Sequence, residues 1–305
     1  MKLRALAPGK VNLCLFLGGV RDDGFHALVS LMESVSLADD LSLTTLEGSV
    51  DEVVCPGVDG PNLVAAAVAG LRSGGWDGPA VRIVVRKRVP VAGGMGGGSA
   101  DAAAALRLAA RVREPLARVL ASEAAALGAD VPSQLAPGVS IVTGAGEVVE
   151  RVAALAPHAW LIVPQPFGLS TAEVYREADR LGLGRSPVDL DRLRGDVRDV
   201  VARPGATPAH ELLVNDLQPA ALSLRPEIAD ALDAVLYAGA EHAIVCGSGP
   251  TVAGLFFGED GHARAAAGAS SLAGRYPATC AAVPVDEQFA APRHLPPAAE
   301  FPQSP

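Results

Sequence analysis

A glycine-rich segment constrains this chain more than any other part of its sequence. The segment reads VPVAGGMGGGSAD from Val89 to Asp101, follows a β-branched stretch that begins at Val81, and leads directly into an alanine-rich stretch. A loop with so many glycines costs backbone entropy, so it is expected to have a use. Its backbone N–H groups, with the N-terminus of the following helix, can surround phosphate oxygens. The pattern predicts a nucleotide phosphate site, and a plain flexible linker is the alternative.

The composition indicates a globular chain with a large core and no general affinity for polyanions. Half of the 305 residues are hydrophobic, 19% are charged, and the formal net charge is −9. This balance argues against broad binding to nucleic acid or to anionic membranes, so a phosphate site has to be local. The four cysteines form no CxxC pair, which favours a reduced cytoplasmic protein without a zinc module. No apolar run approaches the roughly 20 residues that span a bilayer.

The hydrophobic patterns predict an α+β protein. In the first part of the chain we expect helices over 62–72, from 99 onward and over 115–127, and strands over 2–6, 11–17, 28–37, 41–45 and 81–89. The first two strands are separated by Pro8-Gly9. Ser99 is a candidate N-cap, with Asp101 in the first helical turn.

A domain boundary is expected near residue 155, after a turn-rich stretch over 138–150. The predicted domains run over 1–155 and 156–286, and the Pro- and Ala-rich end over 287–305 is expected to be disordered. In the second domain we expect strands over 160–163, 243–246, 252–257 and 279–283, and helices over 171–181, 223–238 and 262–274.

Three motifs identify a family that the glycine loop fits. The chain has no GxxxxGK[ST] P-loop, no GxGxxG after an early strand, and no HRD or DFG kinase set. It does carry APGKVNL from Ala7, then the glycine loop, then VCGSGPTV from Val245. In order and spacing these three segments resemble the signature motifs of the GHMP kinases, which include galactokinase, homoserine kinase, mevalonate kinase and phosphomevalonate kinase.

Four shorter segments narrow the resemblance to one subfamily: RDDGFH from Arg21, KRVP from Lys87, GADVP from Gly128 and VNDL from Val214. The resemblance implies a two-domain fold, with an N-terminal half like domain 2 of ribosomal protein S5 and a ferredoxin-like α/β sandwich in the C-terminal half. The implied activity is ATP- and Mg²⁺-dependent phosphorylation of the 2-hydroxyl of a methylerythritol unit joined to cytidine diphosphate, in the non-mevalonate route to isoprenoids.

Several other functions stay open at this point. The chain could be a GHMP kinase of the homoserine or mevalonate type, a non-catalytic ligand-binding paralogue, or another nucleotide-binding module. The resemblance implies a cytoplasmic monomer or homodimer that acts on a small molecule, without nucleic-acid or membrane partners.

The resemblance also assigns a catalytic pair. Asp130 would accept or orient the proton of the acceptor hydroxyl, and Lys10 would keep Asp130 ionised and stabilise charge that develops toward the γ-phosphate. Taken alone, Asp130 is more typical of a helix cap and Lys10 of a surface lysine.

Further roles follow from the same resemblance. The β- and γ-phosphates would be surrounded by Gly93, Gly94, Met95, Gly96, Gly97, Gly98 and Ser99, and Ser99 is also a candidate Mg²⁺ ligand. Asn62 and Lys87 resemble positions that contact the nucleotide, although Lys87 could equally be a solvated strand lysine.

On the acceptor side, Phe25 and His26 resemble a cytidine-reading pair, and an aromatic face beside a His suits a pyrimidine. Asn12 shares a strand face with Lys10, because residues two apart point to the same side. Thr171 fits a loop on the acceptor side of the subfamily's site.

Overall fold

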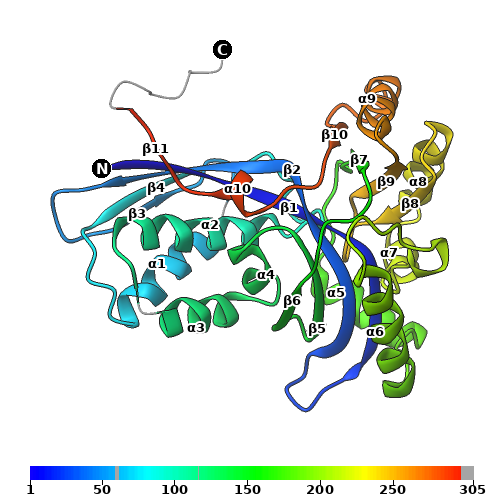
Figure 1. Ribbon diagram of the computed structural model, residues 1–305, viewed down its shortest axis with the longest axis horizontal. Coiled ribbons are helices and arrows are strands. Elements are labelled where there is room, and N and C mark those ends of the chain that lie inside the picture. The colour runs from blue at the N-terminus through cyan, green and yellow to red at the C-terminus, as the bar shows by residue number, and fades with distance from the viewer. Residues whose placement is uncertain (59–61, 116, 297–305) are drawn as a thin grey trace.

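The strands of the protein form two sheets in a computed structural model that describes residues 1–58, 62–115 and 117–296 (Figure 1). The seven-stranded sheet follows the order β11-β1-β2-β4-β3. Strand β5 also pairs with β2, and β6 pairs with β5. Its strands are β1 (Lys2–Val20), β2 (His26–Thr45), β3 (Glu52–Val54), β4 (Val81–Arg86), β5 (Val139–Gly144), β6 (Val148–Arg151) and β11 (Arg293–His294). The four-stranded antiparallel sheet has the order β10-β7-β9-β8 and contains β7 (His158–Val163), β8 (His242–Val245), β9 (Val252–Phe257) and β10 (Cys280–Ala282).

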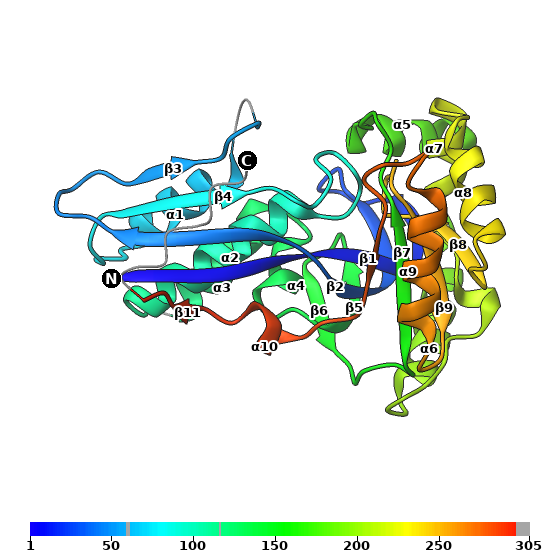
Figure 2. The ribbon, with the colours of Figure 1, turned by 90° about the horizontal axis from the view of Figure 1, so that it is seen from above.

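Strands β1 and β2 are long and run through both halves of the molecule (Figure 2). They pair antiparallel along their length, with register shifts that include one between Pro8 and Lys10. The expected break at Pro8-Gly9 is therefore wrong, as is the expected division of 28–45 into two strands. A register shift tolerates a proline within a strand. The backbone N–H of Lys10 donates instead to the carbonyl of Met95, at 2.9 Å, and so joins β1 to the glycine loop.

Helices cover one face of the seven-stranded sheet (Figures 1 and 2). They are α1 (Leu63–Ser73), α2 (Gly97–Val112), α3 (Ala117–Leu127) and α4 (Val131–Leu135). Asn62 caps α1 by accepting from the backbone N–H of Val64, at 2.8 Å, and the predicted start of this helix is confirmed. Helix α2 begins earlier than expected, because Gly96 is its N-cap with a φ of +65°. The predictions of Ser99 as N-cap and of Asp101 in the first turn are therefore wrong.

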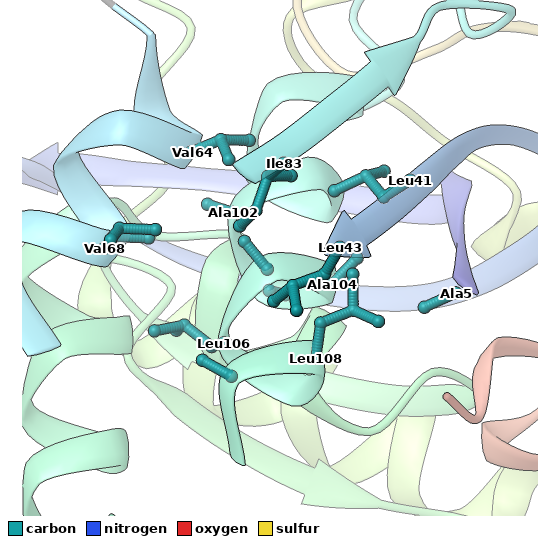
Figure 3. Packing of buried hydrophobic residues seen from close by; sticks show 14 of the residues in the cluster. Ala5, Leu41, Leu43, Val64, Val68, Ile83, Ala102, Ala104, Leu106 and Leu108 are labelled. Atoms are coloured by element: carbon teal, nitrogen blue, oxygen red, sulfur yellow. The ribbon is translucent and has the colours of Figure 1, made fainter. Parts of the chain in front are cut away.

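The alanines of α2 allow it to pack closely on the sheet. Ala102, Ala104 and Leu106 are fully buried against Leu43 and Ile83 of β2 and β4 (Figure 3). Burial of apolar surface stabilises by about 25 cal/mol per Å², and small side chains let the backbones approach. This packing fixes α2, and with it the glycine loop, relative to the strands.

The helices of the C-terminal half pack on the second sheet and on the β1–β2 pair. They are α5 (Thr171–Leu181), α6 (Pro187–Val201), α7 (Gln218–Leu224), α8 (Ile228–Tyr237) and α9 (Gly261–Leu272), with a short 3-10 turn at His210–Leu212. The single helix expected over 223–238 is wrong, because α7 ends before Pro226 and α8 begins after it. Helix α6 was not expected from the sequence, and the β5–β6 hairpin occupies most of the stretch expected to be rich in turns.

The two halves share a core rather than meeting at a linker. One cluster of buried side chains contains Val11 and Leu13 of β1, Leu31 of β2, and Trp160 and Ile162 of β7. The proposed boundary near residue 155 thus lies between two sheets that are packed together.

A C-terminal strap, residues 283–296, returns from β10 to the first sheet (Figure 2). Its α10 (Glu287–Ala290) buries Ala290, and β11 pairs with Leu3 and Arg4 of β1. The expectation of disorder from residue 287 is therefore wrong for 287–296, and 297–305 lie outside the described residues. Within the described part of the chain, no helix is long and apolar enough to cross a membrane.

Candidate active site

A cavity of about 490 Å³ joins residues from both halves of the molecule. Its lining includes most of the predicted site residues, namely Lys10, Asn12, Asn62, Lys87, Gly93, Gly94, Met95, Gly96, Gly97, Gly98, Ser99, Asp130 and Thr171. Phe25 and His26 are not among the lining residues. The structure thus brings together segments from Lys10 to Ser248, and the predicted cytidine-reading pair lies outside the cavity wall.

Lys10 and Asp130 face each other in this cavity. The Lys10 ammonium lies 3.5 Å from Oδ2 of Asp130. The Lys10 side chain is 7% exposed and that of Asp130 is 33% exposed, so the carboxylate reaches the open space while the ammonium is enclosed. Lys10 is not a surface lysine. Asp130 stands at the N-cap position of α4, but its side chain makes no capping hydrogen bond.

A chain of buried hydrogen bonds orients the Lys10 ammonium. Nζ of Lys10 donates to Oδ1 of Asn12, at 2.9 Å. Nδ2 of Asn12 donates to Oγ of Ser30, at 2.8 Å, and that hydroxyl donates to the carbonyl of Cys14, at 2.6 Å. Because Asn12 presents its oxygen to Lys10, the ammonium is held by a neutral acceptor on one side and by Asp130 on the other.

The backbone of the glycine loop lies in close contact with Lys10 and Asp130. A Cβ at Gly96 would lie 3.1 Å from Cγ of Lys10 and 3.2 Å from Oδ2 of Asp130. The φ of Gly96 is also in the left-handed region that favours glycine. The first N–H groups of α2 have no intrahelical acceptor, and they lie where the loop meets the cavity. This arrangement is an anion site of the kind found at helix N-termini.

The loop after β8 packs against the glycine loop from the other half. A Cβ at Gly94 would lie 1.9 Å from the carbonyl oxygen of Cys246, so the two backbones are in direct contact. Asn215 holds this loop, because its Nδ2 donates to the carbonyls of Val245, at 2.8 Å, and Gly247, at 2.7 Å. The Ser248 hydroxyl lies 3.0 Å from that of Thr171, at the start of α5.

Lys87 also lines the cavity, in a buried cluster with two carboxylates. Its ammonium donates to Oδ2 of Asp39, at 2.5 Å, and to Oδ2 of Asp101, at 2.6 Å. Lys87 is therefore not a solvated strand lysine. Burial opposes its charged form, but the two carboxylates outweigh that effect and raise the pKa of Lys87. Burial, followed by the charge of Asp39, raises the pKa of Asp101.

His26 lies beside the cavity, next to the lining residue Tyr175. The centroids of their rings are 5.1 Å apart, and Nε2 of His26 lies 2.7 Å from Oδ1 of Asp179. Burial, with a smaller contribution from the charge of Asp130, raises the pKa of Tyr175 to about 12, so its phenol remains a hydrogen-bond donor. Phe25 is 65% exposed at the tip of the β1–β2 hairpin.

Sequence reasoning missed Tyr175, Asp39 and the structural role of Asn215. The spacing of Thr171 and Tyr175, one turn apart on a predicted helix, was available as a signal that both face the same side. Asp39 gave no such signal, because a DD pair in a hydrophobic segment is more typical of a turn.

The described residues contain no group of three or more His, Cys, Asp or Glu side chains placed to hold a metal ion. The acidic groups in the cavity wall are Asp101, which is paired with Lys87, and Asp130, which is paired with Lys10. Mg²⁺ commonly takes only one or two protein ligands and completes its shell with phosphate oxygens and water. The donor set is therefore compatible with a Mg²⁺ ion that arrives with a nucleotide.

Comparison with known proteins agrees with this geometry. A family model described as the GHMP kinases N terminal domain matches residues 62–138, and one described as the GHMP kinases C terminal matches residues 203–278. The chain is 39% identical to the 4-diphosphocytidyl-2-C-methyl-D-erythritol kinase of Streptomyces coelicolor, over 84% of this chain and 88% of that protein. It is 42% identical to the enzyme of the same name from Corynebacterium efficiens, over 83% of this chain and 84% of that protein.

Solved structures show the same likeness. A crystal structure of 4-(cytidine 5′-diphospho)-2C-methyl-D-erythritol kinase superimposes with a TM-score of 0.71 at 30% identity, covering 92% of this chain and 98% of that one. A homoserine kinase from Cytophaga hutchinsonii has a TM-score of 0.67 at 17% identity, covering 96% of both chains, and shares the fold. The α+β fold expected from the sequence is confirmed. The chain belongs to the GHMP kinase family and resembles the 4-diphosphocytidyl-2-C-methyl-D-erythritol kinases within it throughout most of its length.

Proposed function

We propose that this protein is a cytoplasmic kinase that transfers the γ-phosphoryl group of ATP to the 2-hydroxyl of 4-diphosphocytidyl-2-C-methyl-D-erythritol. The observation that carries the proposal is the Lys10–Asp130 pair, 3.5 Å apart, at the point where the glycine loop and the N-terminus of α2 meet the cavity. Identity of about 40% to kinases named for that acceptor supports the choice of substrate.

The triphosphate would lie on the backbone of the glycine loop. The free N–H groups at the start of α2 supply fixed dipoles, and this contact needs no P-loop. The enclosed Lys10 ammonium adds a full positive charge at the terminal phosphate. Because Asn12 fixes that ammonium before substrate binds, little reorganisation is needed when charge develops during transfer. Asn62, which caps α1 with its side-chain oxygen and lines the cavity, would contact the nucleoside.

Asp130 would receive the proton of the acceptor hydroxyl. Its carboxylate is partly exposed to the cavity and lies 3.5 Å from the Lys10 ammonium. Ser99, in the first turn of α2, would be the protein ligand of Mg²⁺. The bound ion would neutralise charge on the β- and γ-phosphates.

The cytidine would lie toward His26 and Tyr175. Asp179 engages Nε2 of His26 and leaves Nδ1 for the polar edge of the base, while the Tyr175 ring provides an apolar face. Phe25 is exposed and available to cover the other face of the pyrimidine. Thr171 and Asn12 would line the path from the base to the reacting hydroxyl.

The test is to incubate the purified protein with Mg·ATP and one acceptor at a time. The acceptors are the cytidine-bearing compound, homoserine and mevalonate. ADP release and the phosphorus NMR spectrum of the product identify the acceptor and the hydroxyl. For Asp130→Asn we expect kcat to fall by about 10²–10⁴ with nucleotide binding retained, because a positioned base contributes about that much. Asp77→Asn, which alters an exposed carboxylate paired with Arg113, is the matched control.

Two outcomes would contradict the proposal. Phosphorylation of homoserine or mevalonate in preference to the cytidine compound would make the chain a different GHMP kinase. Equal nucleotide binding by the wild type and Asp130→Asn, with no turnover of any acceptor, would make it a non-catalytic paralogue.

A further inference from the structure

We propose that Asp39 is a positioning residue for the nucleotide, and that its carboxylate holds the base of the glycine loop in the geometry that receives the triphosphate. This inference rests on the proposed kinase function. Asp39 is not among the residues that line the cavity, so it acts through the loop rather than by touching the nucleotide.

The Asp39 carboxylate accepts hydrogen bonds from three consecutive residues, 87–89, where β4 ends and the glycine loop begins. Oδ1 of Asp39 accepts from the backbone N–H of Val89, at 2.8 Å, and from that of Arg88. Oδ2 accepts from the Lys87 ammonium, at 2.5 Å. Hydrogen bonds to an ionised acceptor are stronger than neutral ones. The start of the loop is therefore fixed to the middle of β2.

Lys87 connects this cluster to the helix at the other end of the loop. The same ammonium donates to Oδ2 of Asp101, at 2.6 Å. Asp101 is the fifth residue of α2. Asp39, Lys87 and Asp101 thus tie the entry of the loop, at 88–89, to the helix that receives its exit at 97. Between these points, the segment from Pro90 to Gly96 carries no polar side chain, and three of its seven residues are glycine.

The cluster is enclosed, which makes it rigid. Asp39 is fully buried, the Lys87 side chain is 15% exposed, and that of Asp101 is 6% exposed. Buried charges persist only when they are paired, and the single ammonium of Lys87 pairs with both carboxylates. The shape of the loop therefore depends on the three groups together, and the loop presents its N–H groups to the phosphates in a fixed arrangement before ATP binds.

The neighbouring carboxylate provides a matched comparison. Asp40 is also buried and ion-paired, but it pairs with Arg4, at 2.6 Å, on the opposite face of β2. Replacing either aspartate by asparagine removes one buried negative charge from the same strand. Only Asp39→Asn disturbs the glycine loop. Asparagine at 39 presents one oxygen and one NH₂ group, so it cannot accept from the backbone N–H groups and from Lys87 at once.

The experiment measures nucleotide affinity in the full-length protein without any acceptor, by calorimetric titration with Mg·ADP, and then KM for ATP and for the acceptor. For Asp39→Asn we expect the Kd for Mg·ADP and the KM for ATP to rise about tenfold, the effect of losing roughly one charge-assisted hydrogen bond. The KM for the acceptor should stay within about twofold, because the loop lies on the phosphate side.

Asp40→Asn should lower the melting temperature but leave both nucleotide parameters unchanged. The inference is overturned if Asp39→Asn binds Mg·ADP within twofold of wild type, or if Asp40→Asn weakens binding equally. Should Asp39→Asn fail to fold by circular dichroism, Asp39→Ser, which also removes the carboxylate, takes its place in the Mg·ADP titration, and an affinity within twofold of wild type overturns the inference. Because ADP binding needs no acceptor, this result is separate from an error in the assigned acceptor.

Discussion

Gly94→Ala is expected to separate the two backbone loops that form one wall of the cavity. Gly94 has a φ of +78°, and an added Cβ would lie 1.9 Å from the carbonyl oxygen of Cys246 and 2.7 Å from the nitrogen of Gly249. An ordinary contact begins at 3.4 Å, so one loop has to move by about 1.5 Å. Both neighbours are backbone atoms, which cannot rotate away as a side chain would.

The magnitude follows from these two effects. A left-handed φ costs a non-glycine residue about 1–2 kcal/mol, which lowers the free energy of unfolding. The displacement is larger than the 1 Å misplacement that can cost about 10² in rate. We therefore expect kcat/KM to fall by about 100-fold or more, through both ATP binding and transfer, and the melting temperature to fall as well.

The assay is steady-state ADP release, together with thermal unfolding followed by circular dichroism. Gly182→Ala is the matched control, because Gly182 ends α5 with a φ of +68° and a Cβ added there would meet no atom within 4 Å. It should show the backbone strain without the displacement, and so lose stability but not activity. A Gly94→Ala enzyme with kcat/KM within threefold of wild type would refute the reasoning, as would an equal loss of activity in Gly182→Ala.

Three further changes test other parts of the structure. Asn215→Ala leaves the Gly247 carbonyl without its side-chain donor, so the free energy of unfolding should fall by about 1–3 kcal/mol in chemical denaturation. We also expect a lower kcat/KM, and an unchanged free energy of unfolding would contradict this prediction. Burial lowers the pKa of His158, but the hydrogen bond and charge of Glu33 outweigh it and raise that pKa above 6.5. The stabilisation is thus full below pH 6.5 and is lost as pH rises through the folded pKa, so the stability advantage over His158→Gln should shrink with increasing pH in denaturation series. Phe25→Ala should raise the KM for the acceptor about tenfold and leave the KM for ATP and the melting temperature unchanged, because its ring is exposed without substrate.

Local patterns were enough to predict most helices and short strands. Asn62 before an apolar run marked the start of α1, and Thr171 marked that of α5. Helix α6 carries comparable signals, with Ser186 as its cap and Pro187 in its first turn, but its many charged residues concealed the apolar positions. The sequence could not predict that β1 continues past Pro8, because that depends on the register shift and on a hydrogen bond from Lys10 to a loop 85 residues away.

In the candidate site, too, some features could be predicted from local sequence and others depend on contacts between distant segments. The glycine loop and its helix were predicted from the local sequence, in which five glycines precede an alanine run, with a flexible linker as the alternative. The pairing of Lys10 with Asp130 was expected only through the family resemblance, because local rules favoured a cap and a surface lysine. The burial of Lys87 between Asp39 and Asp101 was not expected, since three distant segments have to meet before these charges can compensate one another.

The continuous β1–β2 ribbon limits how this protein can move and be divided. Both strands take part in the shared core and in the walls of the cavity. Because the ribbon runs without a break from one half into the other, we expect admission of substrates to depend on loop displacement rather than on a hinge between two bodies. For the same reason, severing the polypeptide near residue 155 would not release two autonomous pieces, because the C-terminal fragment would lose the strands that its own apolar surface covers.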